Sequence, residues 1–277
     1  MEKRFKGKAL YQPSGKAAEY SPWAVNFYTG CSNDCTYCYC KRGVMSHVWD
    51  NKPQIKKCFR NTEHAIRMFS HELAQNIDKV KESGILFSFT TDPMLPETKQ
   101  LTLLCTELAL DMDVPVKILT KSVDWFYEAD FRSYLDKPSI LQLKKNKVAF
   151  GFTLTGFDEE EPFASSNHDR IEVMRNLYEL GFKTFASIEP VLTPAMSWNM
   201  IQATKGFCNL FKVGLISGKK INYDNIYIDR FFVNLTVLST RGIKIYLKDS
   251  FLKWMKLDRN NLPGDFVNSD YNIFKEK

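Results

Sequence analysis

Several sequence features are absent, and each absence removes a class of protein. The 277-residue chain has no run of 18 apolar residues, so we expect no membrane-spanning helix and no membrane partner. Its basic, polar start, MEKRFKGKALYQPSGK, lacks the apolar segment of a secretory signal, which favours a cytoplasmic location. No Walker loop, G-x-G-x-x-G motif or Ser-His-Asp order is found, and the four histidines do not form a metal-binding set. No Pro-, Gly- or Ser-rich linker divides the chain, so we predict a single domain.

The composition is that of a globular protein. Apolar residues make up 44% of the chain, with 21 Phe among them, which is enough for a large core and excludes disorder as a global description. The formal net charge of +6 is a weak electrostatic signal. It is compatible with nucleic acid as a partner, and equally with a solvated, slightly basic surface.

Short β-rich runs recur along the chain, and helical patterns lie between most of them. The predicted strands are Ala24–Tyr28, Ile85–Thr90, Val116–Thr120, Val148–Leu154, Phe182–Ile188, Leu210–Ile216 and Ile243–Leu247. Apolar residues at helical spacing predict helices over 64–81, 98–112 and 170–180. Alternating strands and helices indicate an α/β fold with a parallel sheet, either a partial TIM-like barrel or a doubly wound sheet. We assign the barrel to residues 20–250, with extensions at 1–19 and 251–277.

Polar residues follow most of the predicted strands. The pattern includes Thr91 and Asp92, Lys121, Thr153 and Thr155, Glu189, and the run from Ser217 to Lys220. Taken singly, most of these residues read as helix caps. In parallel α/β folds, however, ligands bind beyond the carboxyl ends of the strands, and an amino-acid-like cofactor needs hydroxyl, carboxylate and ammonium groups.

Four of the seven cysteines fall within ten residues, directly after the first predicted strand. Cys31, Cys35 and Cys38 form a C-x3-C-x2-C motif. Three thiolates on one loop can bind three irons of a [4Fe–4S] cluster and leave the fourth iron open to a small molecule. Zinc is the alternative, with Cys35 and Cys38 at zinc-knuckle spacing and Cys31, Cys40 or Cys58 completing four ligands, but no second pair of ligands at zinc-site spacing is present.

The motif resembles the signature of the radical S-adenosylmethionine (SAM) superfamily. Further segments, FTTDPMLPETKQLT, VPVKILTKS and FKTFASIEPV among them, are similar to the spore photoproduct lyase-like group, also described as DNA repair photolyase-like proteins. The resemblance runs from about Tyr20 to Lys248. It implies a partial (β/α)6 barrel, a [4Fe–4S] cluster, and cleavage of SAM to a 5′-deoxyadenosyl radical that abstracts hydrogen from a substrate.

The resemblance also implies roles for individual residues. Cys31, Cys35 and Cys38 would hold the cluster as metal ligands, and Glu189 would contact the substrate or act as an acid or base. The cofactor would be bound by Tyr37 at the adenine, Tyr39 nearby, Thr91 and Asp92 at the amino-acid portion or ribose, Lys121 at the carboxylate, and Thr153 and Thr155 at the ribose.

The implied reaction is lyase- or repair-like, on a nucleic acid or nucleotide, with electrons from a flavodoxin or ferredoxin. One departure matters: photoproduct lyases carry a hydrogen-donating cysteine near the second strand end, where this chain has Phe89. Two other functions stay open at this point. One is a non-catalytic zinc-binding nucleic-acid module, and the other is a radical SAM enzyme acting on a peptide or small metabolite.

Overall fold

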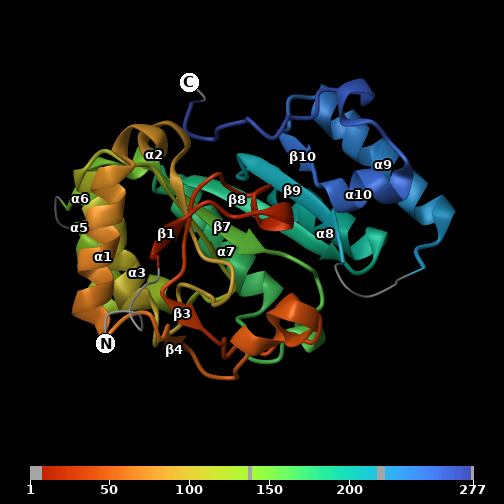
Figure 1. Cartoon of the computed structure of the whole chain (residues 1–277). Coiled ribbons are helices and arrows are strands. Elements are labelled where there is room, and N and C mark those ends of the chain that lie inside the picture. The colour runs from red at the N-terminus through yellow and green to blue at the C-terminus, as the bar shows by residue number, and fades with distance from the viewer. Residues whose placement is uncertain (1–7, 137–138, 217–221, 276–277) are drawn as a thin grey trace.

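The computed structural model describes residues 8–136, 139–216 and 222–275, and its centre is one curved eight-stranded sheet (Figure 1). The sheet order is β1-β2-β5-β6-β7-β8-β9-β10. Its strands are β1 (Leu10–Tyr11), β2 (Ala24–Val25), β5 (Ile85–Phe87), β6 (Val116–Thr120), β7 (Val148–Thr153), β8 (Lys183–Val191), β9 (Leu210–Leu215) and β10 (Ile245–Leu247). All neighbours pair in parallel except β1, which is antiparallel to β2. The predicted α/β fold, a partial barrel with a parallel sheet, is confirmed.

All seven predicted strands overlap strands of this sheet, although their ends differ. The first predicted strand is divided: β2 ends at Val25, and β3 (Tyr28–Thr29) pairs with β4 (Gln54–Ile55) in a separate antiparallel sheet. Asn26 lies at the division, where its side chain donates to the Tyr11 hydroxyl and accepts from the Phe89 amide. The β3–β4 pair was not predicted, and it encloses the cysteine loop, residues 30–53.

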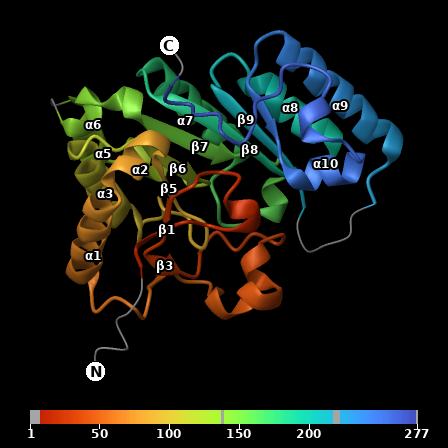
Figure 2. The ribbon, with the colours of Figure 1, turned by 45° about the horizontal axis from the view of Figure 1, so that its top comes forward.

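Helices cover the outer face of the sheet, with α1 and α3 towards one end and α8 and α9 towards the other (Figure 2). The α-helices are α1 (Thr62–Gln75), α2 (Ile77–Ser83), α3 (Lys99–Asp111), α4 (Asp124–Tyr127), α5 (Ala129–Asp136), α6 (Ile140–Leu143), α7 (Asn167–Glu179), α8 (Pro194–Thr204), α9 (Asn225–Thr240) and α10 (Asp249–Met255). Short 3-10 turns are η2 (Gly15–Ala17), η3 (Tyr39–Lys41), η4 (Gly43–Val48), η5 (Lys145–Lys147), η6 (Asp158–Glu160) and η7 (Arg259–Asn261). Within the described ranges, no helix is both long and apolar enough to cross a bilayer.

The single helix predicted over 64–81 is wrong, because the chain leaves helical geometry at Asn76. This residue has φ −116° and ψ 17°, and its side-chain amide donates to the Glu72 carbonyl at 2.8 Å. Asparagine competes in this way for backbone hydrogen bonds and so interrupts helices. The helices predicted over 98–112 and 170–180 correspond to α3 and α7.

Residues that alternate along the strands face the helices or the interior of the barrel. The interior is filled by a small apolar cluster that includes Leu86, Ala149, Phe185 and Tyr246. Gly151 belongs to the same layer, and a Cβ atom there would lie 2.1 Å from Cζ of Phe185, so glycine is required. This layer fills the lower part of the barrel, below the cavity at the carboxyl ends of the strands.

The N-terminal extension crosses the open side of the barrel. Near one edge, the amides of Ala9 and Leu10 both donate to Oε2 of Glu72 on α1, at 2.9 and 2.8 Å. Near the other edge, Oε1 of Glu19 accepts from the Asp249 amide at 2.7 Å. The described part of this extension therefore links the first strands of the sheet to its last strand.

The C-terminal segment makes a second such crossing. The Val267 amide donates to the Ile245 carbonyl on β10 at 3.0 Å, and the Asn272 side chain donates to the Glu82 carbonyl on α2 at 2.7 Å. Both tails thus stabilise an open barrel whose edge strands do not pair with each other. The division at residues 20 and 250 stays a prediction.

Candidate functional site

A cavity of about 590 Å³ lies at the carboxyl ends of the parallel strands. This volume falls within the range of small-molecule sites, about 300–1,000 Å³. One wall is the cysteine loop, and the opposite wall is formed by β8 and the end of β10. Every predicted site residue except Thr155 lines it: Cys31, Cys35, Tyr37, Cys38, Tyr39, Thr91, Asp92, Lys121, Thr153 and Glu189.

Thr155 is fully buried in the turn that follows β7. Its amide and that of Gly156 donate to Oδ1 of Asn167, and its hydroxyl accepts from the Phe157 amide. The side chain shapes a turn, so we leave Thr155 out of the proposed cofactor site. The run from Ser217 to Lys220 lies outside the described residues.

The base of the cysteine loop is fixed by backbone contacts. The Gly30 amide donates to the Val48 carbonyl and the Cys31 amide to the Asp50 carbonyl, both at 2.9 Å. Gly30 has φ +78°, and a Cβ atom there would lie 2.2 Å from the Lys52 carbonyl oxygen. Only glycine fits this position, which sets the direction in which the loop enters the cavity.

Cys31, Cys35 and Cys38 are the only cysteines among the described residues that line the cavity. A hydrogen bond from the Cys40 thiol lowers the pKa of Cys38 to about 6, while burial raises the pKa of Cys31 to about 12 and raises that of Cys35. The lowered pKa favours the thiolate form of Cys38, which is the form that binds metals. The remaining thiols must lose their protons when a metal binds.

The cysteine loop offers three thiols on one wall of the cavity, which fits a cluster. In the described part of the chain, no group of three His, Cys, Asp or Glu side chains is arranged as ligands of one metal ion. A cubane binds each thiolate at a different iron, so three separate sulfurs on one wall suit it. Thr91 Oγ1 is also buried beside the cavity without a hydrogen-bond partner among the described residues, as expected for a group that contacts a ligand.

Asp92 lies at the centre of a hydrogen-bond network and is saturated by it. Its carboxylate accepts from the Asn33 side chain at 2.8 Å, the Thr120 hydroxyl at 2.6 Å, and the amides of Lys121 and Met94 at 2.7 and 3.0 Å. Two carboxylate oxygens offer about four acceptor positions, and four donors occupy them. Asp92 therefore ties the cysteine loop to the ends of β5 and β6 and has little capacity left for a cofactor.

Lys121 carries a positive charge beside the cysteines. Its Nζ lies 5.5 Å from the ring centroid of Tyr37. Burial lowers the pKa of Lys121, but the negative charges of the Cys35 thiolate and the Glu161 carboxylate outweigh it, so the net pKa is raised. The ammonium stays charged and is placed to stabilise thiolates or a ligand carboxylate.

The wall opposite the cysteines carries a polar cluster that was only partly predicted. Glu189 Oε2 accepts from the Tyr20 hydroxyl at 2.7 Å and from Nζ of Lys248 at 2.6 Å, and the hydroxyls of Tyr20 and Ser187 are 2.6 Å apart. Burial and then the Glu189 charge raise the pKa of Tyr20 well above its ordinary value. No described residue donates to Glu189 Oε1, which leaves one acceptor beside the cavity.

Sequence reasoning missed Lys248, Tyr20 and Asn33. Lys248 follows the last strand, so the rule that selected Lys121 would have found it. Asn33 lies within the cysteine motif at a position that the motif leaves free. Tyr20 precedes the barrel, and nothing in its local sequence indicates that it reaches Glu189. Phe89 lines the cavity, at the place where the resemblance puts a lyase cysteine.

Comparisons with known proteins found a matching family model, similar sequences and solved structures of similar fold. The family model of the Radical SAM superfamily matches residues 25–208. The uncharacterized protein MJ0683 of Methanocaldococcus jannaschii is 25% identical over 272 residues, which cover 92% of this chain and 86% of that protein. The uncharacterized protein ORF301 of Acidianus two-tailed virus is 28% identical over 180 residues, 62% of this chain and 56% of that protein.

Among solved structures, SuiB of Streptococcus suis is similar in fold. The SAM-bound crystal structure superposes with a TM-score of 0.53 at 12% identity, covering 83% of this chain and 52% of SuiB. Another SuiB structure gives 0.54 at 14% identity, covering 84% of this chain and 51% of SuiB. The chain thus spans about half the length of SuiB, and at this identity the likeness concerns the fold alone.

Proposed function

The chain belongs to the radical SAM superfamily and is an enzyme, and from this premise we propose that its cavity binds a [4Fe–4S] cluster and SAM and uses them to abstract hydrogen from a substrate. The observation that carries the proposal is that the three motif cysteines, and no other described cysteine, line one cavity at the carboxyl ends of the strands. When bound, this pair of cofactors supplies an electron from the cluster that cleaves SAM and yields a 5′-deoxyadenosyl radical.

The residues of the chain would share the binding of the two groups. Cys31, Cys35 and Cys38 would hold the cluster, and Lys121 would pair with the carboxylate of SAM. Thr91 offers its unpartnered hydroxyl to the amino-acid portion. The buried Thr153 and the aromatic Tyr37 and Tyr39 complete the set, at the ribose and the adenine. Asp92 would position this set rather than contact the cofactor, because its oxygens are already occupied.

We propose that the substrate is a nucleotide, or one nucleotide unit of a nucleic acid, and that the reaction is lyase- or repair-like. Tyr11, Trp49 and Phe89 also line the cavity, and aromatic rings of this kind stack on bases. Glu189 Oε1 would accept an N–H or O–H of the substrate. The volume of about 590 Å³ excludes a double helix. These features fit the spore photoproduct lyase-like group, with Phe89 in place of the lyase cysteine.

The remaining expectations also belong to this proposal. Radical SAM enzymes generally need a reductant, and a flavodoxin or ferredoxin would supply electrons here. The enzyme would work in the cytoplasm, where thiols stay reduced.

Anaerobic reconstitution tests the cofactor chemistry. The wild-type chain should bind about four irons and form 5′-deoxyadenosine from SAM when dithionite is added. Cys35→Ala should lose both properties. The matched control is Cys58→Ala, which removes a half-buried thiol outside the cavity and should keep both. Deoxyadenosine formation by the Cys35→Ala protein would refute the proposal.

Deuterium transfer tests the substrate class. Candidate nucleotides and short single-stranded oligonucleotides, deuterated in sugar and base, are incubated with the reconstituted enzyme, and deoxyadenosine is analysed by mass spectrometry. Deuterium in deoxyadenosine identifies a substrate. A peptide or unrelated metabolite that transfers deuterium, while the nucleotides do not, would overturn the substrate class but not the cofactor chemistry.

A further inference from the structure

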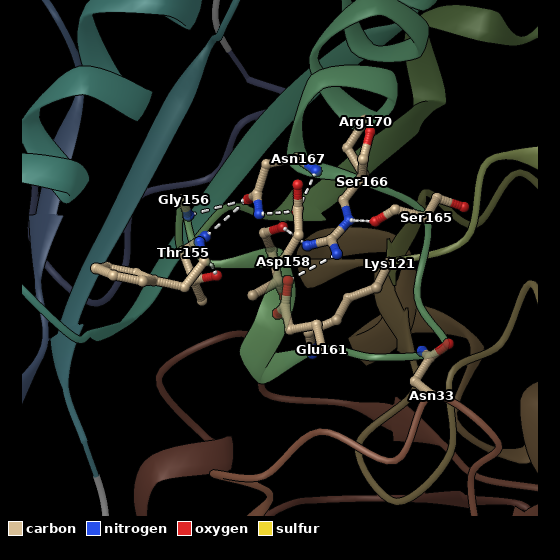
Figure 3. Close-up of polar contacts among 12 residues, drawn as sticks. Asn33, Lys121, Thr155, Gly156, Asp158, Glu161, Ser165, Ser166, Asn167 and Arg170 are labelled. Carbon is tan, nitrogen blue, oxygen red and sulfur yellow. Dashed lines mark hydrogen bonds and ion pairs between the residues drawn. The ribbon is translucent and has the colours of Figure 1, made fainter.

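A fully buried ion pair lies outside the cavity, behind the cysteine loop. Nη2 of Arg170, on α7, is 2.7 Å from Oε2 of Glu161, and both side chains have no exposed surface. The same guanidinium donates to the Ser165 carbonyl at 2.8 Å (Figure 3). It also donates to the Thr153 carbonyl at 2.7 Å. Burying two charges carries a desolvation cost that their attraction often fails to offset, so stability alone does not account for the pair.

The other contact of Glu161 indicates a role for the buried ion pair. Its second oxygen, Oε1, accepts a hydrogen bond from the Tyr37 hydroxyl. Tyr37 stands between Cys35 and Cys38 in the motif. The adjacent residue, Thr36, is held by the same segment, since its amide donates to the Glu160 carbonyl at 3.0 Å and its hydroxyl to the Glu160 carboxylate.

These contacts join two segments that are far apart in sequence. The turn after β7, residues 154–166, holds residues 36 and 37 from outside the cavity, and Arg170 fixes Glu161 from the helix behind that turn. With Arg170 bound to one oxygen and Tyr37 to the other, the Glu161 carboxylate has a single orientation. A buried hydrogen bond to a charged acceptor is among the stronger ones in proteins.

We infer that Glu161 is a positioning residue for the cysteine loop: it holds Tyr37 and thereby fixes the backbone between Cys35 and Cys38, and Arg170 holds Glu161 in place. The inference goes beyond the proposed function and rests on it for its purpose, since the loop is held ready for the cluster. The contacts among Tyr37, Glu161 and Arg170 are made by the chain alone and do not require the cluster. The position of Tyr37 also sets the distance of its ring from Nζ of Lys121, 5.5 Å.

The test uses the full-length, metal-free chain under reducing conditions and measures alkylation of individual cysteines by iodoacetamide, read by mass spectrometry. Cys35 is buried at the cavity wall, so its alkylation rate depends on how often the loop opens. Tyr37→Phe removes only the hydroxyl and leaves the ion pair intact. Loss of one such hydrogen bond should raise the alkylation rate of Cys35 about fivefold through more frequent opening.

Two further variants separate positioning from general loss of stability. Tyr223→Phe is the matched control, because it removes another buried tyrosine hydroxyl bond, 2.6 Å to the Val191 carbonyl, away from the cysteines. It should leave the Cys35 rate unchanged. Glu161→Ala should raise that rate more than Glu161→Gln, since glutamine still offers an oxygen to Tyr37. Rates are measured over a pH series so that changes in thiolate fraction are separated from changes in access.

The outcomes decide the inference without reference to activity. An unchanged Cys35 rate in Tyr37→Phe, or an equal increase in Tyr223→Phe, overturns it. Iron content after reconstitution is measured on the same proteins. If the wild-type chain takes up no cluster, the proposed function fails, while the alkylation rates still show whether Glu161 holds the loop.

Discussion

Two ion pairs lie beside the same cavity, Glu161 with Arg170 and Glu189 with Lys248. Their carboxylates differ in burial and in which oxygens have hydrogen-bond partners. Glu161 has Arg170 beside one oxygen and Tyr37 on the other, and its side chain has no exposed surface, so it cannot reach a ligand in the cavity. Glu189 accepts from both Tyr20 and Lys248 on Oε2, and its other oxygen has no donor among the described residues. The first carboxylate is placed to hold the loop, and we propose that the second contacts the substrate.

Burial and free acceptor positions therefore distinguish the carboxylates around this cavity. Asp92 has four donors and little acceptor capacity left, so we propose that it positions the cofactor site, although the sequence placed it among the cofactor contacts. The comparison also predicts different responses when each pair is broken, because Glu161 is sealed from water whereas the Glu189 side chain is 15% exposed.

Breaking the sealed pair should have the largest effect on stability. Arg170→Met leaves the Glu161 charge buried without its partner and should lower the free energy of unfolding by about 3–5 kcal/mol. Urea denaturation of the metal-free protein measures this loss. Adding Glu161→Leu removes the stranded charge and should recover part of the stability. A loss below about 1 kcal/mol in the single variant would show that the pair is not sealed.

Breaking the other pair should cost less. Lys248→Met leaves Glu189 with the Tyr20 hydroxyl and some access to water, so we expect a loss of about 1–3 kcal/mol. The same urea titration compares the two variants directly. A loss as large as that of Arg170→Met would contradict the distinction between the two carboxylates.

Titration of the barrel interior should sharpen the comparison. Burial lowers the pKa of Lys117 from its ordinary 10.5 to about 8, and Lys212 nearby also has a lowered pKa through burial and through the charges of Lys117 and Lys248. Between pH 8 and pH 10.5, the two pKa values of Lys117, the unfolded chain binds more protons at Lys117 than the folded chain. The free energy of unfolding therefore rises with pH in this range. Relative to Lys117→Met, the wild-type protein should gain about 1 kcal/mol from pH 8 to pH 9.

Urea titrations of both proteins at several pH values measure this difference. Subtracting the variant removes the contributions of tyrosines and cysteines that titrate in the same range. A difference that is flat or falls with pH would mean that Lys117 is as well solvated as a surface lysine.

The smallest effect on the free energy of unfolding is expected at an exposed ion pair. This pair gives the baseline against which Arg170→Met and Lys248→Met are compared. Lys275 lies 3.6 Å from Glu82, and the two side chains are 65% and 76% exposed. Lys275→Gln should change the free energy of unfolding by less than about 0.5 kcal/mol, because water and salt screen such pairs. An effect above about 1 kcal/mol would indicate that the ion pair between Lys275 and Glu82 stabilises the C-terminal segment on the barrel.

Much of the molecule follows from local sequence. Short β-rich runs predicted all seven parallel strands, and polar residues after those strands predicted which edge carries the cavity. The spacing of Cys31, Cys35 and Cys38 brings three thiols together by chain connectivity alone. Asn76, by contrast, broke a helix that periodicity made continuous, because its side chain competes for a backbone carbonyl.

The sequence alone determined the strand–helix order and the cysteine motif, since both depend on residues close together in the chain. Only the tertiary structure decided that Glu161 holds Tyr37, 124 positions away, and that Lys248 reaches Glu189, 59 positions away. It also decided that Asp92 accepts four hydrogen bonds while Oε1 of Glu189 has no donor among the described residues. Partners and burial set the role of a carboxylate, and both exist only once distant segments have packed together.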